Sequence, residues 1–169
     1  MSDEILCATC RKTISDDDLA ADGVLTWSFN PGNECLPERS ELRHSICYQR
    51  AALEERAGVI LEFENGWVPL VTRLMDAIDA VGLDYKVDQI KEKFGGLRFY
   101  WHPKSQDDDG SIPEGREGAV DQIEVLVAAA EDESLTTCEV CGEPGRTRRG
   151  SYVRTLCDTH DGGVATHEG

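Results

Sequence analysis

The chain lacks long apolar runs and is poor in basic residues, and both absences narrow what it can be. No apolar segment approaches the ~20 residues that span a bilayer, so we expect no membrane span. Only 17 Lys and Arg residues stand against 33 Asp and Glu residues, which gives a formal net charge of −16. Phosphate binding needs clustered cations, so this balance disfavours general coating of nucleic acid. It favours solubility and, as the more specific alternative, a protein partner with a basic surface.

The sequence also lacks the motifs of several enzyme classes. It has no His-Glu-x-x-His of metalloproteases, no His-x-Glu of zinc deaminases, and no glycine-rich phosphate loop. The segment 142–156 contains no histidine, which a nuclease of the His-Asn-His kind would need. His102 is read as an ordinary surface histidine, with a hydrolase that uses it as the remaining enzymatic alternative. We therefore predict a protein that binds rather than catalyses.

Cysteine is present in a spacing typical of zinc ligands. Near the C-terminus, Cys138-x-x-Cys141 is followed after fifteen residues by Cys157-x-x-His160. Three thiolates and one imidazole match a tetrahedral structural zinc site. A redox dithiol would not need the second Cys/His pair. We predict that these four residues hold Zn²⁺.

A second signature of the same composition lies near the N-terminus. Cys7-x-x-Cys10 is followed, after a long insert, by His44-x-x-Cys47. We predict a second Cys3His zinc site here. The seventh cysteine, Cys35, is either a buried apolar residue or an alternative ligand of this site.

The pattern of apolar and turn-forming residues predicts an α+β fold. It has a small antiparallel sheet, three helices and two modules of treble-clef or zinc-ribbon type. We expect helices over 40–57 (with Ser40 as N-cap), 69–81 and 117–133, and β-structure over 23–29, 85–102 and 146–156. On the 85–102 hairpin, Leu97, Phe99 and Trp101 should share one face. The predicted domains are an N-terminal zinc module (1–58), an α+β core (59–134) and a C-terminal zinc module with a tail (135–169).

Basic residues gather on two predicted hairpins despite the overall acidity. If the hairpins are neighbours, they would form a patch with aromatic residues between the cations, which is typical of nucleic-acid binding. In the simpler interpretation, the cations pair with the surplus acidic residues. The candidates for nucleic-acid or partner contact are Lys91, Lys93, Arg98, Arg146, Arg148, Arg149 and Arg154.

The segment 66–160 resembles an uncharacterised family of zinc-ribbon-like proteins found in bacteriophages and prophages. The resemblance lies in Gly66-Trp67 before an amphipathic helix and in the run from Gln89 to Tyr100 (QIKEKFGGLRFY). It continues in the Cys-x-x-Cys-Gly segment at 138–142 and in Thr-Leu-Cys-x-x-His at 155–160. The resemblance implies a small phage-type zinc protein in the cytoplasm of a bacterial host, and it carries no known activity.

These observations predict a non-enzymatic, zinc-stabilised acidic protein that binds a macromolecule of the phage or host. Such binding would modulate transcription or a defence system. The alternatives are a nucleic-acid-binding zinc protein that uses the basic hairpins, and a structural component of the virion. The acidic N-terminus carries no secretory signal, and reduced thiols suit metal binding in the cytoplasm.

Overall fold

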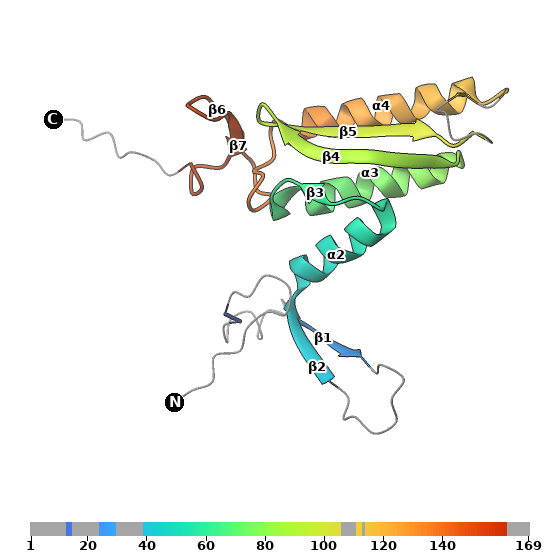
Figure 1. Ribbon diagram of the computed structural model, residues 1–169. Helices are drawn as coiled ribbons and strands as arrows, with labels where there is room; N and C mark the ends of the chain where they lie inside the picture. Colours follow the sequence, from blue (N-terminus) through green and yellow to red (C-terminus); the bar gives the residue numbers. More distant parts are fainter. Residues whose placement is uncertain (1–12, 15–23, 30–38, 106–110, 113, 162–169) are drawn as a thin grey trace, which may run out of the picture. The chain divides into compact units, whose positions relative to one another are not determined.

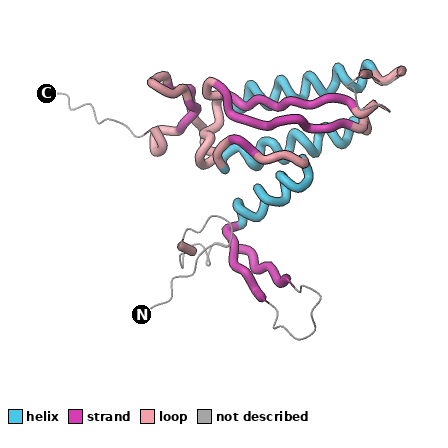
Figure 2. The backbone as a smooth tube through the Cα atoms, in the orientation of Figure 1, coloured by secondary structure: helices cyan, strands magenta, loops and turns pink. Residues whose placement is uncertain are grey.

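The computed structural model describes residues 13–14, 24–29, 39–105, 111–112 and 114–161, of which 24–29 and 39–44 are described by their backbone alone (Figure 1). Contacts divide the chain into two compact units, Met1–Ala52 and Leu53–Gly169. Figure 2 shows both helices and strands in the second unit, and its residues include the C-terminal metal signature. Within the described part of the chain, no helix is long and apolar enough to cross a membrane.

The first unit contains a β-hairpin where a helix start was predicted. Strand β1 (Val24–Phe29) is confirmed, and it pairs antiparallel with β2 (Arg39–His44), from Val24 opposite His44 to Phe29 opposite Arg39. Helix α2 therefore begins at Ser45 rather than Ser40, because the backbone of 39–44 is engaged in pairing with β1. His44 therefore ends the strand, whereas Cys47 lies in the first turn of the helix.

Helix α2 (Ser45–Ala57) ends as its sequence predicts, and the second unit continues with a short strand that was not predicted. Gly58 follows the helix with a φ of +71°, and its N–H donates to the carbonyl oxygen of Glu54 at 2.9 Å. This left-handed residue after the last turn is typical of a helix C-terminus. Strand β3 (Leu61–Glu62) then pairs parallel with the strand that begins at Tyr85, so the sheet is mixed rather than purely antiparallel.

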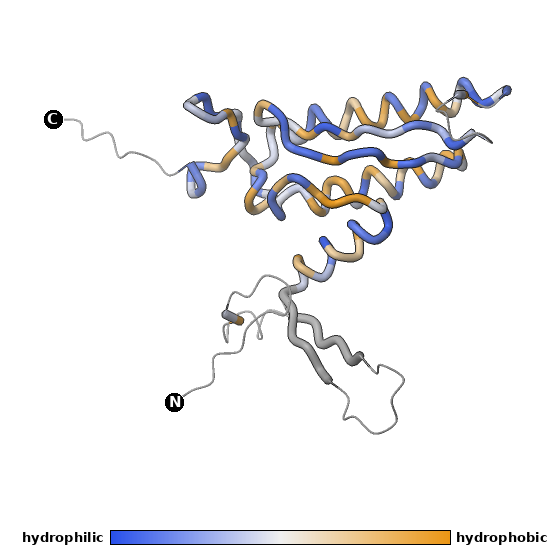
Figure 3. Tube along the Cα trace, viewed as in Figure 1, coloured by the Kyte–Doolittle hydropathy of each residue, from blue (hydrophilic) through white to orange (hydrophobic). Residues whose placement is uncertain are grey.

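Helix α3 confirms the predicted helix over 69–81. It spans Val68–Val81 and follows a single 3-10 turn, η1 (Asn65–Trp67). Pro69 lies in the first turn, where its missing N–H costs nothing, and Gly82 caps the end with a φ of +74°. Figure 3 shows apolar residues recurring along α3, and this face is buried in the core.

The predicted central hairpin is also present. Strands β4 (Tyr85–Lys93) and β5 (Gly96–Pro103) pair antiparallel and complete a sheet of order β3-β4-β5. Their two-residue turn has positive φ at both central positions, +55° at Phe94 and +80° at Gly95, as in a type I′ turn. Of the three residues predicted to share one face, Leu97 and Phe99 are buried and Trp101 is half-buried, whereas Tyr100 is exposed.

Helix α4 (Glu117–Ser134) packs with α3 and against β5, and it also protects the edge of the sheet. The N–H of Leu97 donates to Ser134 Oγ at 2.8 Å, and the N–H of Phe99 donates to Glu131 Oε1 at 3.1 Å. Two donors at an edge strand are thus satisfied by side chains of the helix, which blocks pairing with another chain there. The predicted helix over 117–133 is confirmed.

The described chain ends in a small two-stranded sheet, β6 (Arg146–Arg148) and β7 (Arg154–Leu156). This is the predicted hairpin within 146–156. The fold is therefore α+β, with three α-helices and three small sheets in the described residues.

Candidate metal centre

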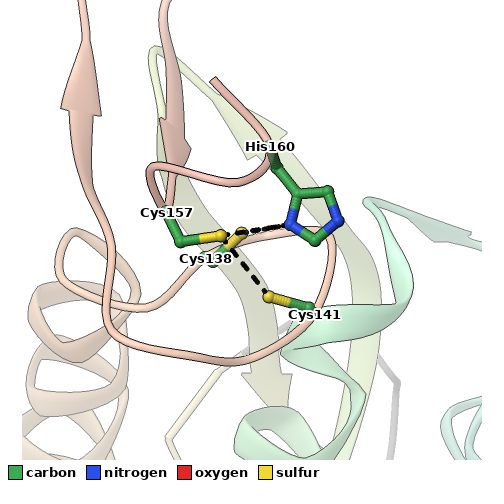
Figure 4. Close-up of side chains that lie close together, drawn as sticks. All are labelled: Cys138, Cys141, Cys157 and His160. Carbon is green, nitrogen blue, oxygen red and sulfur yellow. Dashed lines mark hydrogen bonds between the residues drawn. The ribbon is translucent and has the colours of Figure 1, made fainter. Parts of the chain in front are cut away.

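The four predicted C-terminal ligands converge on one point (Figure 4). Cys138 and Cys141 lie on a tight turn, in which the N–H of Gly142 donates to the carbonyl oxygen of Cys138 at 2.8 Å. Cys157 follows β7 directly, and His160 lies one turn later. The backbone N–H of His160 donates to the carbonyl oxygen of Cys157 at 3.2 Å. The β6–β7 hairpin therefore returns the second pair of ligands to the first. The ligand atoms of all four residues lie within 4.8 Å of one another.

The spacing of these atoms fits a tetrahedral zinc ion. With Zn–S of ~2.3 Å and Zn–N of ~2.0 Å, two thiolates lie ~3.8 Å apart, and a thiolate lies ~3.5 Å from an imidazole nitrogen. The Sγ atoms of Cys141 and Cys157 are 3.7 Å apart, and Cys138 Sγ is 3.6 Å from His160 Nδ1. Cys157 Sγ lies closer to Nδ1, at 3.1 Å. The donor set therefore suits Zn²⁺, with Nδ1 as the nitrogen that faces the sulfurs.

Local electrostatics favour a thiolate at Cys138. Burial opposes its ionisation, but the backbone N–H groups of Cys157, Cys141 and Val140, helped by the Cys141 thiol, lower the pKa of Cys138 to about 6. Burial and the neighbouring thiols raise the pKa of Cys141 to about 11, against the effect of the Glu143 N–H. One thiol thus ionises readily, whereas the next needs a cation to hold a second negative charge beside it. A bound metal supplies that cation.

A buried glycine and tryptophan attach this turn to the core. The N–H of Gly66 donates to the carbonyl oxygen of Glu139 at 2.7 Å, and Trp67 Nε1 donates to that of Thr137 at 2.8 Å. Trp67 is fully buried. A Cβ on Gly66 would lie 2.3 Å from the carbonyl oxygen of Cys138, so only glycine fits. In the sequence, Gly66-Trp67 indicates only the family resemblance, because the partners that give it this positioning role lie about 70 residues away.

Glu139, between the two cysteines, was also missed. Its side chain is 5% exposed, and Oε2 accepts from Arg154 Nε at 3.0 Å, while Oε1 accepts from the N–H of Glu64 at 3.2 Å. The backbone N–H of Glu139 donates to the carbonyl oxygen of Thr155 at 2.9 Å. This residue therefore ties the ligand turn to strand β7 and to the segment before η1. From the sequence alone, a charged residue between two cysteines is expected to be exposed. Only the fold shows that Glu139 is buried and paired with Arg154.

The predicted N-terminal zinc site is not shown. Cys7, Cys10 and Cys35 lie outside the described residues, and His44 is described by its backbone alone. Cys47 is buried, 4% exposed, in a cluster with Ile14 and the half-buried Ile46. Among the described residues, the C-terminal group is the one Cys/His cluster that could hold a metal.

No family model, no curated protein and no solved structure matches the chain. The resemblance to a phage family therefore stays a prediction.

The two basic hairpins are neighbours, but most of their arginines are paired within the protein. Thr155 Oγ1 donates to the carbonyl oxygen of Gly95 at 2.6 Å, which joins β7 to the β4–β5 turn. The paired arginines are Arg98 with Glu131, Arg146 with Asp158, Arg148 with Asp158 and Asp161, and Arg154 with Glu139 and Glu64. These contacts support the simpler interpretation, in which the arginines pair with acidic residues of the protein itself. In the described residues, Lys91, Lys93 and Arg149 have no such ion pair.

His102 is likewise engaged in the fold. Its Nδ1 lies 2.9 Å from Asp88 Oδ2 across the β4–β5 hairpin. The structure does not bring it to the Cys/His cluster, since it lies on β5 near the end opposite the turn.

Proposed function

We propose that the chain is a zinc-stabilised binding protein in which Cys138, Cys141, Cys157 and His160 hold a structural Zn²⁺. The observation that carries the proposal is the convergence of four protein donors at tetrahedral spacing. Four protein ligands leave no coordination position for a substrate or for an activated water, which is the arrangement of structural rather than catalytic zinc. The metal would hold the ligand turn, β7 and the segment at Gly66 in one arrangement.

The proposed role is to present a surface to a macromolecule. The net charge of −16 supports a partner with a basic surface, and the resemblance of 66–160 to phage proteins supports a partner from the phage or its host. Reduced thiols at the site suit the bacterial cytoplasm. The N-terminal signature, Cys7, Cys10, His44 and Cys47, is proposed as a second zinc site.

Elemental analysis of the purified protein and of its Cys138→Ser variant tests the metal proposal. We expect the wild type to contain zinc and the variant to contain one equivalent less, whereas Cys47→Ser separately reports on the N-terminal site. Equal zinc in wild type and Cys138→Ser would refute the C-terminal site. The binding role fails if the zinc-loaded protein turns over nucleotides or nucleic acid and single substitutions abolish that turnover.

A further inference from the structure

Phe94 occupies a position that neither packing nor backbone geometry favours. It is the first central residue of the β4–β5 turn, with a φ of +55°, and its side chain is 72% exposed. Type I′ turns favour Asn, Asp or Gly at this position, because a bulky side chain is strained at positive φ. Among the described residues, Phe94 is the one non-glycine residue with positive φ. The fold alone gives no reason for an aromatic ring here.

The ring continues a row of side chains on the open face of the sheet. Helices α3 and α4 lie on the face where Leu97 and Phe99 are buried (Figure 1). On the opposite face, Lys91 Nζ lies 5.4 Å from the centre of the Tyr100 ring, and Lys93 Nζ lies 5.5 Å from that of Phe94. Lys91 and Lys93 are two residues apart on β4, so they point to the same side. Lys91, Lys93, Phe94 and Tyr100 form what we call the aromatic–lysine row.

The two lysines of the row form no ion pair with any described residue, although the protein is acidic. In the described part of the chain, no carboxylate forms an ion pair with Lys91 or Lys93, although the protein has 33 acidic residues. The neighbouring carboxylates are engaged elsewhere. Glu62, opposite Lys91 on β3, accepts from Gln89 Nε2 at 2.5 Å. Glu92, between the two lysines on β4, accepts from the N–H of Gly95 at 2.6 Å and from Tyr152 Oη at 2.6 Å. Both lysine charges are therefore available to an anionic ligand.

We propose that the aromatic–lysine row binds single-stranded nucleic acid. Exposed rings on an open sheet face offer stacking platforms for unpaired bases, and cations beside them reach the flanking phosphates. An acidic polypeptide would satisfy the lysines but gives no reason for a strained aromatic residue at the turn. The proposal goes beyond the proposed function, from which it takes only a folded zinc module.

The probe is a fluorescently labelled oligothymidylate of about 12 nucleotides, titrated with zinc-loaded protein and followed by anisotropy. Two phosphate contacts predict that affinity falls about sevenfold between about 50 and 200 mM salt, and that Lys91→Gln with Lys93→Gln removes this dependence. Lys104→Gln is the charge-matched control, because Lys104 follows β5 at the end opposite the turn. Its affinity and salt dependence should equal those of the wild type.

Phe94→Asn separates binding from folding. Asn suits the positive φ, so the variant should melt about 4 °C higher, yet it should bind the oligonucleotide about tenfold more weakly. Tyr100→Leu should also weaken binding and provides a second test at a position of ordinary backbone geometry. Val125→Ala, at an exposed apolar position on α4, should change nothing.

Three results would overturn the proposal: no binding by protein of full zinc content, wild-type affinity in both aromatic variants, or equally effective displacement by polyglutamate. The last result would assign the row to an acidic polypeptide. Zinc content is measured on the same samples, so each of these failures is distinct from failure of the metal site.

Discussion

Gly66 and Gly142 lie back to back, although 76 positions separate them in the sequence (142 − 66). A Cβ on Gly142 would lie 3.0 Å from the carbonyl oxygen of Gly66, and a Cβ on Gly66 would lie 2.5 Å from the N of Gly142. Gly142 also has a φ of +81°, which favours glycine. The turn that carries Cys138 and Cys141 can therefore approach the core only because neither Gly66 nor Gly142 has a side chain.

Gly66→Ala should therefore disturb both the core and the metal turn. The added methyl group meets backbone atoms of Cys138, Glu139 and Gly142, which cannot move aside as a flexible side chain would. We expect a loss of about 3 kcal/mol in the free energy of unfolding and weaker zinc binding. Denaturant unfolding and zinc competition with a chromogenic chelator measure the two effects.

Gly118→Ala is the matched control for that substitution. Gly118 lies in α4, and a Cβ there meets nothing within 4 Å. Because alanine favours the helix, the control should gain about 0.5–1 kcal/mol. Equal stability in the two variants would show that the close approach at Gly66 does not exist in solution.

Glu139→Gln should show that the carboxylate between the cysteines holds the turn in place. The substitution leaves Arg154 with the more distant Glu64, at 3.9 Å, and removes the charge that accepts the hydrogen bond at 3.0 Å. We expect a loss of about 2 kcal/mol, since one partner of a largely buried pair is neutralised. Glu133→Gln removes an equal charge from a pair with Arg73 that is exposed on both sides, and its melting temperature should be unchanged. Identical melting curves for the two variants would contradict the assignment.

The sequence predicts most of the second unit because its signals are local. Pro69 and Gly82 mark the ends of α3, and Gly95 marks the hairpin turn. The four C-terminal ligands are also recognisable from their spacing alone, because tetrahedral zinc constrains both pairs.

What the sequence does not predict depends on long-range contacts. Residues 39–44 have helix-compatible composition, and only pairing with β1 makes them a strand. Strand β3 has two residues, too few for a pattern, and it exists because β4 lies beside it. The sequence predicts that Glu139 is a surface residue, whereas in the fold β7 places Arg154 beside its carboxylate. Such features need the fold itself, because their partners are distant in sequence.

Metal removal should be visible from Trp67, whose Nε1 donates to the backbone just before Cys138. Chelation should release the ligand turn, weaken this hydrogen bond and shift tryptophan emission to longer wavelength. Acidification should give the same shift, because zinc ligands must be deprotonated to bind. In Trp67→Phe, zinc loss should still lower the melting temperature, whereas the emission change should be small. If the emission shift is unchanged in that variant, the shift comes from Trp27 or Trp101 and not from Trp67.

The Tyr85 hydroxyl should lose its proton at a higher pH than an ordinary tyrosine does. Burial raises its pKa, and the hydrogen bond from Tyr85 Oη to Asp79 Oδ1, at 3.0 Å, together with the Asp79 charge, brings it to about 12, although Arg56 acts in the opposite direction. A pKa that is higher in the folded state than the ordinary value of 10 means that the contribution to stability is full below pH 10. It is then lost as the pH rises from about 10 to about 12. Absorbance of the phenolate and melting curves across this window measure the two consequences.

Asp79→Asn should lower the pKa of Tyr85 toward its ordinary value, although burial would still hold it somewhat above. The substitution also removes one of the two carboxylates that bind Arg56, each at 2.7 Å, so some stability should be lost at neutral pH. Asp88→Asn is the charge-matched control, because Asp88 lies beside His102 rather than beside a tyrosine. The hydrogen bond to Asp79 is the cause only if the phenolate transition moves in Asp79→Asn and stays in place in Asp88→Asn. Equal shifts in both variants would instead assign the effect to net charge.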